Sequence, residues 1–369
     1  MPAKTAIKTI WTLSSGQDGC DMQITGVAGG LAKRTGAAII AKQLHPPAWR
    51  QLFAPYGRPA PQADIQAPWP HVVLAAGRQT IPYALAIGKQ AKGATFTAIL
   101  QNPRRAPALF DFIWAPAHDA LEGDNVFSTL TSPHALTRDA LTEAAAQLKP
   151  RLTNMARPWI AVLLGGPNKA YRFDMADMAR LVQHLRGLAE KGAGLMISAS
   201  RRTPPAHFAR LKQALAELGE QVIFFTPPNS TLPANSTLPA TNDAPQPDYN
   251  IYHGILGLAQ AIIVTGDSVN MVSEACFVGV PVWVFHLQGG SRRFNNFHKT
   301  MQAQGLVHAL TGNIEAENMG TENAESVDNM LATITQAPPA NSANGLPINS
   351  TDEIVEMLYK HCIEKFENN

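Results

Sequence analysis

Short apolar, β-rich runs alternate with segments of helical periodicity along most of this 369-residue chain, and this alternation restricts its fold more than any other feature. Such runs, separated by crossover helices, are typical of parallel sheets covered by helices on both faces. In the first half, the apolar runs lie at 8–15, 37–44, 71–77, 94–101 and 110–117. Five runs of this kind predict one doubly wound α/β domain.

The same pattern starts again after an Ala-rich helical segment, DALTEAAAQLK, and a polar loop. The second series of runs lies at 158–166, 194–200, 221–227, 261–266 and 281–287. Apolar residues recur at helical spacing in its first two connections: Met178, Leu181, Val182, Leu185 and Leu188, then Phe208, Leu211 and Leu215. With about 150 residues per domain as a guide, we predict an α/β protein of two Rossmann-like domains, at 1–150 and 151–336.

Two segments rich in Pro, Ser and Asn interrupt the second half. Residues 229–240 read NSTLPANSTLPA, a direct duplication typical of an exposed loop. A similar stretch at 337–349 precedes a segment with the pattern of a capping box, Ser350 followed by Glu353. The apolar face of that segment consists of Ile354, Met357, Leu358, Cys362 and Ile363. We therefore expect residues 337–369 to form a linker and a helix that docks on the body of the protein.

Charge and cysteine content exclude several classes of protein. The formal net charge is +2, and the absence of any run of five or more Lys or Arg argues against a nucleic-acid partner. The three cysteines lack CxxC spacing, so we expect neither a disulfide framework nor a zinc site. No secretion signal and no apolar stretch of about 18 residues occurs. We expect a cytoplasmic protein, and contact with the inner face of a membrane stays open.

Several well-known catalytic motifs are missing from the sequence. HExxH, GxxxxGK[ST], GxSxG and GxGxxG do not occur, which disfavours metalloproteases, P-loop NTPases and α/β-hydrolases. His and carboxylate residues do not cluster with metal-ligand spacing. We therefore expect no metal and no resident cofactor.

The segment TGDSVNMVSEA, at 265–275, follows a predicted strand of the second domain. Ligands of open α/β sheets bind beyond the carboxyl ends of the strands, where helix amino termini present backbone N–H groups. Gly266 allows the strand to end tightly, and either Asp267 or Ser268 can cap the next helix. The N–H groups there suit a phosphate or a substrate hydroxyl.

Glu274 lies further along the same predicted helix. Val269, Val272 and Cys276 form the stripe expected to face the sheet, and Glu274 lies about 200° from Val272 on a helical wheel. Its carboxylate therefore projects away from that stripe and could accept two hydrogen bonds from a ribose diol. The alternative is a solvent-facing helix glutamate without a ligand.

Three cationic side chains also follow strands of the second domain. Lys169 comes after Gly165 and Gly166, while Arg201 and Arg202 follow the run at 194–200. If they converge at one edge of the sheet, they would neutralise a diphosphate and stabilise it as a leaving group. The alternative is that they are solvated surface charges.

The first domain offers candidates for a general base. Asp18 follows the first predicted strand, and His118 and Asp119 follow the fifth. A His or Asp at these positions could deprotonate an acceptor hydroxyl, and the alternative is a hydrogen-bonded structural role. Three arginines at strand ends are candidates for binding an acidic acceptor: Arg78, Arg104 and Arg105.

Eight of these segments, taken together, resemble the mitochondrial-fission "elongated mitochondria" family, which has many bacterial members. They are LSSGQDG, AGRQTIPYALAIGK, LQNPRR, FDFIWAPAHD, LLGGPNKAYRFD, ISASRRTPP, VTGDSVNMVSEAC and GVPVWVFHL. The resemblance runs from about residue 10 to about residue 312, and SRRTP at 200–204 and TGDSVNMVSEA at 265–275 are its most specific motifs. The family is similar to GT-B glycosyltransferases, which implies two Rossmann-like domains facing each other across a cleft.

The resemblance implies a nucleotide-sugar donor on the carboxyl-terminal domain. Glu274 matches the ribose-binding glutamate of GT-B enzymes, and Gly266 to Ser268 match the loop before it. The family motifs mark Lys169, Arg201 and Arg202, whose role as diphosphate ligands is our inference. The first loop lacks an HxxGH-like element, so the resemblance does not assign a base.

Three functions are compatible with this sequence. The first is a glycosyltransferase that moves a sugar from a nucleotide-diphosphate sugar to an unidentified acceptor, either lipid-linked or of the cell envelope. The second is a nucleotide-sugar 2-epimerase of the same fold. The third is a non-catalytic adaptor at a membrane surface, since plant members of the family are implicated in organelle fission in that role.

Overall fold

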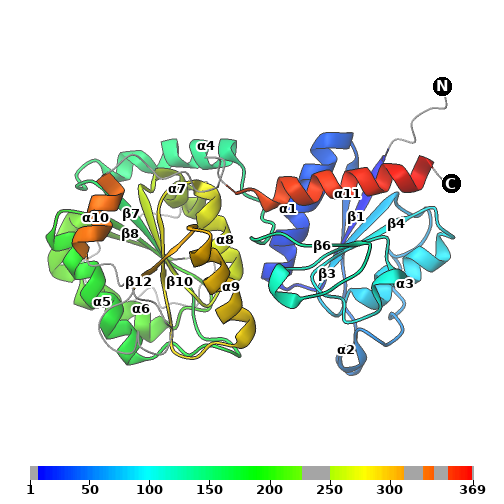
Figure 1. Cartoon of the computed structure of the whole chain (residues 1–369), viewed down its shortest axis with the longest axis horizontal. Coiled ribbons are helices and arrows are strands. Elements are labelled where there is room, and N and C mark those ends of the chain that lie inside the picture. The colour runs from blue at the N-terminus through cyan, green and yellow to red at the C-terminus, as the bar shows by residue number, and fades with distance from the viewer. Residues whose placement is uncertain (1–6, 227–249, 311–326, 336–347, 368–369) are drawn as a thin grey trace. The chain divides into compact units, whose positions relative to one another are not determined.

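The computed structural model describes residues 7–226, 250–310, 327–335 and 348–367 (Figure 1). The duplicated segment at 229–240 and most of the stretch at 337–349 lie outside the described residues. The chain forms two compact units: unit 1 comprises Met1–Ala135 and Asn349–Asn369, and unit 2 comprises Leu136–Ile348. Each unit contains a six-stranded parallel sheet with helices on both faces, which confirms the predicted pair of Rossmann-like domains.

The sheet of unit 1 has the strand order β2-β1-β3-β4-β5-β6. Its strands are β1 Thr9–Ser14, β2 Ala38–Gln43, β3 Val72–Ala76, β4 Phe96–Leu100, β5 Phe112–Trp114 and β6 Val126–Phe127. Its helices are α1 Asp18–Thr35, α2 Ala48–Phe53, α3 Ile81–Gln90 and α11 Ser350–Glu367, with short 3-10 turns η1 Pro107–Leu109 and η2 Ala117–Asp119. The sequence predicted five of the strands, and β6 is an addition.

The carboxyl-terminal helix α11 packs against α1 in unit 1. Ile354, Leu358 and Cys362 are buried with the α1 side of the sheet, as their spacing predicted. Lys365 Nζ lies 2.9 and 2.8 Å from the two carboxylate oxygens of Asp111.

The expected capping box of α11 is wrong. Ser350 instead shares a hydrogen bond with the Thr131 hydroxyl, with the two oxygens 2.6 Å apart. Asn349 Oδ1 accepts a hydrogen bond from the backbone N–H of Asp352 at 3.3 Å, so Asn349 supplies the side chain that caps the first turn.

Unit 2 has the strand order β12-β11-β10-β7-β8-β9. Its strands are β7 Trp159–Leu164, β8 Gly194–Ala199, β9 Val222–Phe225, β10 Ala261–Thr265, β11 Val282–Phe285 and β12 His308–Leu310. Its helices are α4 Arg138–Leu148, α5 Met175–Glu190, α6 Pro205–Ala214, α7 Ile251–Leu258, α8 Val269–Val278, α9 Arg292–Ala303 and α10 Val327–Thr335, with 3-10 turns η3 Lys149–Leu152 and η4 Ala216–Gln221. Strand β12 was not predicted.

The order of strands in unit 2 reverses between β7 and β10. Strands β8 and β9 are added on one side of β7, and β10 to β12 on the other, which makes the β7–β10 boundary a topological switch point. In the parallel register, Val264 stands beside Leu163, so both strands end at the same level. The loops that follow them therefore meet.

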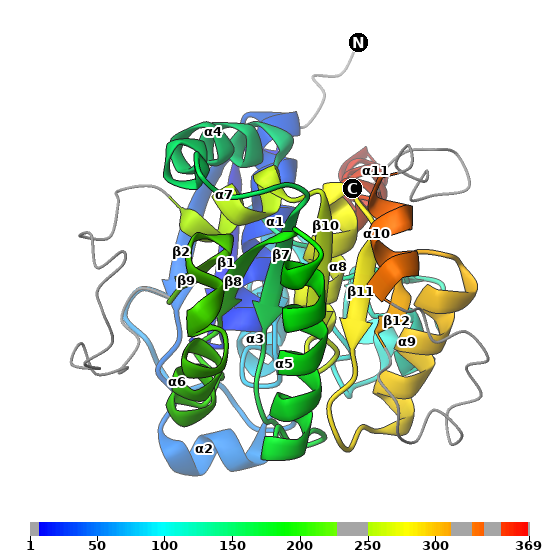
Figure 2. The ribbon, with the colours of Figure 1, turned by 90° about the vertical axis from the view of Figure 1, so that its left-hand side faces the viewer.

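Helices cover both faces of the unit 2 sheet. The stripe from Met178 to Leu188 is buried on one face, with α5, α6 and α10, as the sequence predicted. Figure 2 shows α5 and α6 on the side of unit 2 that faces the viewer. Helices α4, α7, α8 and α9 contribute to the core on the other face.

Helix α4 belongs to unit 2, although the sequence-based ranges placed it in the first domain. It packs along α7, and the backbones approach so closely that a Cβ on Gly257 would collide with the carbonyl oxygen of Leu141. Glycine at 257 permits this contact because it lacks a side chain. No helix among the described residues is both long and apolar enough to cross a membrane.

Candidate functional site

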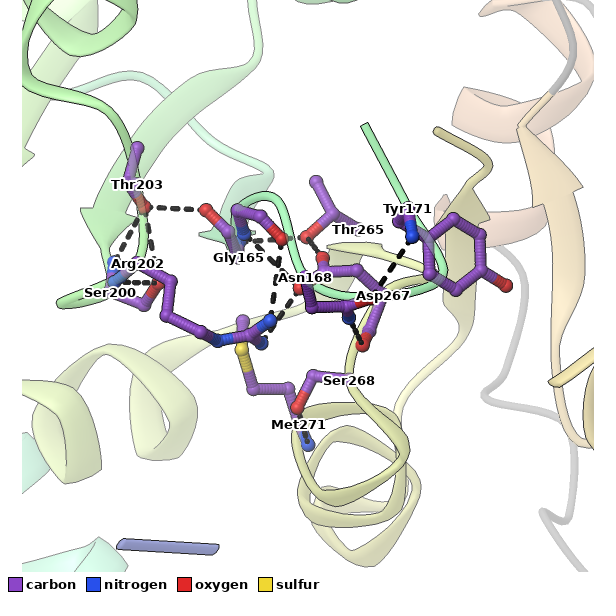
Figure 3. Close-up of polar contacts among 12 residues, drawn as sticks. Gly165, Asn168, Tyr171, Ser200, Arg202, Thr203, Thr265, Asp267, Ser268 and Met271 are labelled. Atoms are coloured by element: carbon purple, nitrogen blue, oxygen red, sulfur yellow. Dashed lines mark hydrogen bonds and ion pairs between the residues drawn. The ribbon is translucent and has the colours of Figure 1, made fainter. Parts of the chain in front are cut away.

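The loops after β7 and β10 are joined by hydrogen bonds at the switch point of unit 2 (Figure 3). Gly165 N donates to Thr265 Oγ1 at 2.7 Å, and Gly166 N donates to Asp267 Oδ2 at 3.1 Å. A Cβ on Gly165 would collide with the Asp267 carboxylate, and one on Gly166 would collide with the carbonyl oxygen of Arg202. The two glycines thus permit an approach that no other residue allows.

Asp267 is a buried carboxylate that ties three loops together, and only 2% of the residue is exposed. Thr265 Oγ1 donates to Asp267 Oδ1 at 2.6 Å, and Arg202 Nη2 lies 2.7 Å from Oδ2. The sequence left open whether Asp267 or Ser268 caps α8; Ser268 does so, by accepting a hydrogen bond from Met271 N at 3.4 Å. Asp267 therefore acts within the protein, and its carboxylate is occupied by these contacts.

The SRRTP segment fastens the loop after β8 to the loop after β7. The Thr203 hydroxyl lies 2.9 Å from the carbonyl oxygen of Leu164 and 2.7 Å from that of Gly165. Ser200 N donates to Thr203 Oγ1 at 2.9 Å, and Arg202 Nη1 donates to the Gly166 carbonyl at 3.3 Å (Figure 3). These contacts explain why Arg and Thr stand at 202 and 203, and Thr203 is a site residue that the sequence analysis missed.

The three predicted cations differ in how firmly they are placed. The Arg202 side chain is 40% exposed and is oriented by Asp267 and the Gly166 carbonyl. Lys169 and Arg201 are exposed in the neighbouring loops. The loop that carries Lys169 is shaped by Asn168, whose Oδ1 accepts hydrogen bonds from the N–H groups of Ala170 and Tyr171. Arg202 thus contacts the loop of Gly165 and Gly166, which we call the glycine loop, through the carbonyl oxygen of Gly166.

Glu274 is buried, with 6% of the residue exposed, and so is not the solvent-facing glutamate that the sequence left as an alternative. The Tyr252 hydroxyl of α7 donates to Glu274 Oε2 at 2.6 Å. Burial raises the pKa of Glu274 to about 7, and the hydrogen bond from Tyr252 opposes that rise. The other oxygen, Oε1, accepts no hydrogen bond among the described residues. No pattern in the sequence had indicated Tyr252 as a residue of the site.

A partly buried histidine, His286, and a buried one, His298, lie beneath the loop after β10. His298 Nε2 is 2.7 Å from the carbonyl oxygen of Gly266, and the rings of His286 and His298 stand edge to face with centroids 5.0 Å apart. Burial lowers the pKa of His286 to about 3 and also lowers the pKa of His298, so both rings are neutral at pH 7. Because a carbonyl oxygen only accepts, Nε2 of His298 carries the proton. His298 thus fixes the backbone at Gly266.

The candidates for a general base all lie in unit 1. Asp18 is the first residue of α1, and the structure does not describe its side chain. His118 and Asp119 occupy η2, directly after β5, with His118 Nε2 3.8 Å from Asp119 Oδ1. Their side chains are 6% and 8% exposed. The structure thus pairs an imidazole with a carboxylate, and which group acts as a base stays a prediction.

Comparison with known proteins confirms the family resemblance that the sequence motifs indicated. The sequence model of the family described as "Mitochondrial fission ELM1" matches residues 19–335. Among relatives, the mitochondrial fission protein ELM1 of Arabidopsis thaliana is 26% identical over 268 residues, which cover 66% of this chain. The same match spans 58% of the Arabidopsis protein.

Solved structures support the fold. The UDP-GlcNAc 2-epimerase of Neisseria meningitidis, bound to UDP-GlcNAc, matches with a TM-score of 0.54 and 14% identity, over 97% of this chain and 100% of that one. A glycosyltransferase of Rickettsia africae matches with a TM-score of 0.50 and 10% identity, over 98% and 97%. At these identities the likeness establishes the GT-B-like fold, as the sequence predicted, and nothing about activity.

Proposed function

The chain belongs to the mitochondrial fission ELM1 family, and on this premise we propose that unit 2 binds a nucleotide-diphosphate sugar and that the protein transfers the sugar to an acceptor. The observation that carries the proposal is the buried carboxylate of Glu274 on the helix after β10, with Oε2 held by Tyr252 and Oε1 without a partner among the described residues. A ribose diol is a suitable donor to such an oxygen. The sugar nucleotide is a substrate, and no resident cofactor is part of the proposal.

The diphosphate would lie at the switch point. There the loop of Gly165 and Gly166 packs closely against the loops after β8 and β10. The amino terminus of α8 carries a partial positive charge at the same place. The loops after β7, β8 and β10 hold four cationic side chains and two carboxylates, which leaves a net charge of +2: Lys169, Arg172, Arg201 and Arg202, against Asp174 and Asp267. That charge matches the two negative charges of a nucleotide-sugar diphosphate.

In the proposed reaction, an acceptor hydroxyl attacks the anomeric carbon of the sugar while the bond to the diphosphate oxygen breaks. The hydroxyl proton passes to a base, and the nucleoside diphosphate leaves with its new charge stabilised by the cations and the helix terminus. His118, Asp119 and Asp18 are the proposed bases. The acceptor class that we propose is lipid-linked or of the cell envelope.

The His118–Asp119 pair also favours a second candidate, a nucleotide-sugar 2-epimerase. An imidazole 3.8 Å from a carboxylate could exchange protons during elimination and re-addition on a single sugar. Incubation with one nucleotide sugar and no acceptor distinguishes the two activities. A change of configuration at C2 would favour the epimerase, and an unchanged sugar with turnover on adding an acceptor would favour the transferase.

Thermal unfolding in the presence of nucleotides tests the donor site. A ligand at ten times its Kd stabilises the native state by about 1.4 kcal/mol, or roughly 3–5 °C for a domain of this size. We expect at least one nucleoside diphosphate or its sugar conjugate to raise the midpoint by this amount, and the matching nucleoside monophosphate to raise it less. If no diphosphate in a panel of the common bases raises the midpoint at millimolar concentration, the donor site is refuted.

A further inference from the structure

We propose that the segment around α2 is a docking surface for an anionic lipid bilayer. Trp49, Leu52, Phe53 and Tyr56 form what we call the α2 face, with exposed fractions of 59%, 78%, 61% and 72%. Four of the ten exposed large apolar side chains in the described part of the chain thus fall within eight residues. The α2 helix buries none of its own residues, and Figure 1 shows it protruding at the lower end of unit 1.

Side-chain contacts attach the α2 segment to its surroundings even though its apolar side chains are exposed. Gln51 links it to its surroundings, because its side chain donates to Pro46 O at 2.9 Å and accepts from Gln79 at 3.0 Å. The Tyr56 hydroxyl donates to Arg104 O at 2.9 Å, and the Arg105 guanidinium lies 5.0 Å from the Tyr56 ring centroid. The face is therefore presented by a fixed scaffold, which reduces the entropy that binding must offset.

The charge around the α2 face is mainly positive, and the next carboxylate along the chain, Asp64, lies 3.7 Å from Lys42 Nζ. Residues 44–63, which include the face, and residues 101–110, whose Arg104 and Arg105 contact the face or its segment, contain four arginines and no Asp or Glu. Arg58 and Arg104 are exposed. Aromatic side chains with a polar tip prefer the interface of a bilayer, and arginines beside them are attracted to anionic headgroups. An anionic membrane surface is therefore the partner that this combination fits.

A small ligand does not fit this place. The cavity between α2 and α3 has a volume of about 10 Å³, which is room for about one water molecule. Its lining includes Arg50, Gln79 and Tyr83. The recognising groups are thus the outward side chains of the face, and the proposal does not depend on the donor site of unit 2.

Sedimentation of the full chain with vesicles tests the proposal. We expect binding to vesicles of phosphatidylcholine and phosphatidylglycerol at about 0.1 M salt, and weaker binding at about 1 M, where the charges are screened. The double variant Trp49→Ser/Phe53→Ser should bind at least about tenfold more weakly, because it removes the apolar anchors. The variant Arg58→Gln/Arg104→Gln should bind about tenfold more weakly at low salt.

The matched control is Ile39→Ser/Ile40→Ser on β2, which changes side chains that are 44% and 40% exposed in the same unit. It should bind vesicles like the unaltered protein. The arginine variant keeps the test decisive should the serine variant fail to fold. The proposal is overturned if the chain does not bind anionic vesicles, if all variants bind equally, or if the serine variant instead abolishes a dimer of the chain.

Discussion

Replacing Glu274 with alanine is expected to weaken binding of a nucleoside diphosphate or its sugar conjugate by about 10- to 100-fold. A hydrogen bond to a charged group contributes about 1.5–3 kcal/mol, and Glu274 is the group that we propose for the ribose. Isothermal titration calorimetry measures the change. Glu190→Ala, an exposed glutamate at the end of α5, is the matched control and should leave the affinity unchanged.

The pH dependence of binding follows from the pKa of about 7 at Glu274. The carboxylate form accepts hydrogen bonds from the ribose, so the affinity for a nucleotide sugar should rise between pH 6 and pH 8, a window centred on that pKa. Because the folded pKa lies above the unfolded value of 4.5, the folded chain keeps a proton that the unfolded chain loses. Stability from this group therefore falls as the pH rises from 4.5 to 7.

Glu274→Gln should abolish both trends, since the amide does not titrate. The ribose assignment would be wrong if Glu274→Ala bound the nucleotide as tightly as the unaltered protein. It would also be wrong if Glu274→Gln kept the rise in affinity with pH.

Gly166→Ala is expected to lower the stability of unit 2 and to abolish the thermal response to nucleotides. The new Cβ would collide with the backbone carbonyl of Arg202, so the loops after β7 and β8 would have to separate. That movement breaks the contacts of Gly166 with Asp267 and Arg202. Overpacking of this kind costs about 1–3 kcal/mol, or roughly 2–12 °C in the unfolding midpoint.

Gly187→Ala provides the control for a glycine in the same unit. Its Cβ would meet Val327 Cγ2 at 3.5 Å, an ordinary contact, and alanine favours the helix by about 1 kcal/mol. Both variants are compared by thermal unfolding with and without nucleotide. If Gly166→Ala resembled Gly187→Ala in stability and in its nucleotide response, the close approach of the loops would not matter for the site.

Most of the fold could be predicted because its signal is local. Ten strands appear as apolar runs in the sequence, and the structure places each of them within the predicted segment. Strand β6 was missed because its two residues are too few to form a pattern, and the short strand β12 was missed as well. The assignment of α4 to unit 2 was missed because an apolar stripe shows that a helix is buried on one face but not which element it packs against. That element is α7.

The candidate site, like the fold, could be predicted only in part. Gly165, Gly166 and the segment from Gly266 to Ser268 could be placed together because strand ends of one parallel sheet share an edge. The partners Thr203, Tyr252 and His298 could not be identified as such, because each acts through a contact to a residue 22–39 positions away in the chain. The helical wheel placed Glu274 away from the sheet but could not show that α7 covers it. Asp267 stays a predicted ligand residue, and its contacts with Gly166, Thr265 and Arg202 could not be read from the sequence.

The central claim is that the β7–β10 switch point of unit 2 holds a nucleoside diphosphate, and a crystal structure of the full chain with UDP tests it most directly. The account predicts density for the diphosphate within hydrogen-bond distance of the Gly165–Gly166 loop and Arg202, with a ribose hydroxyl on Glu274 Oε1. Density for UDP at another place, or a ribose that does not contact Glu274, would contradict it.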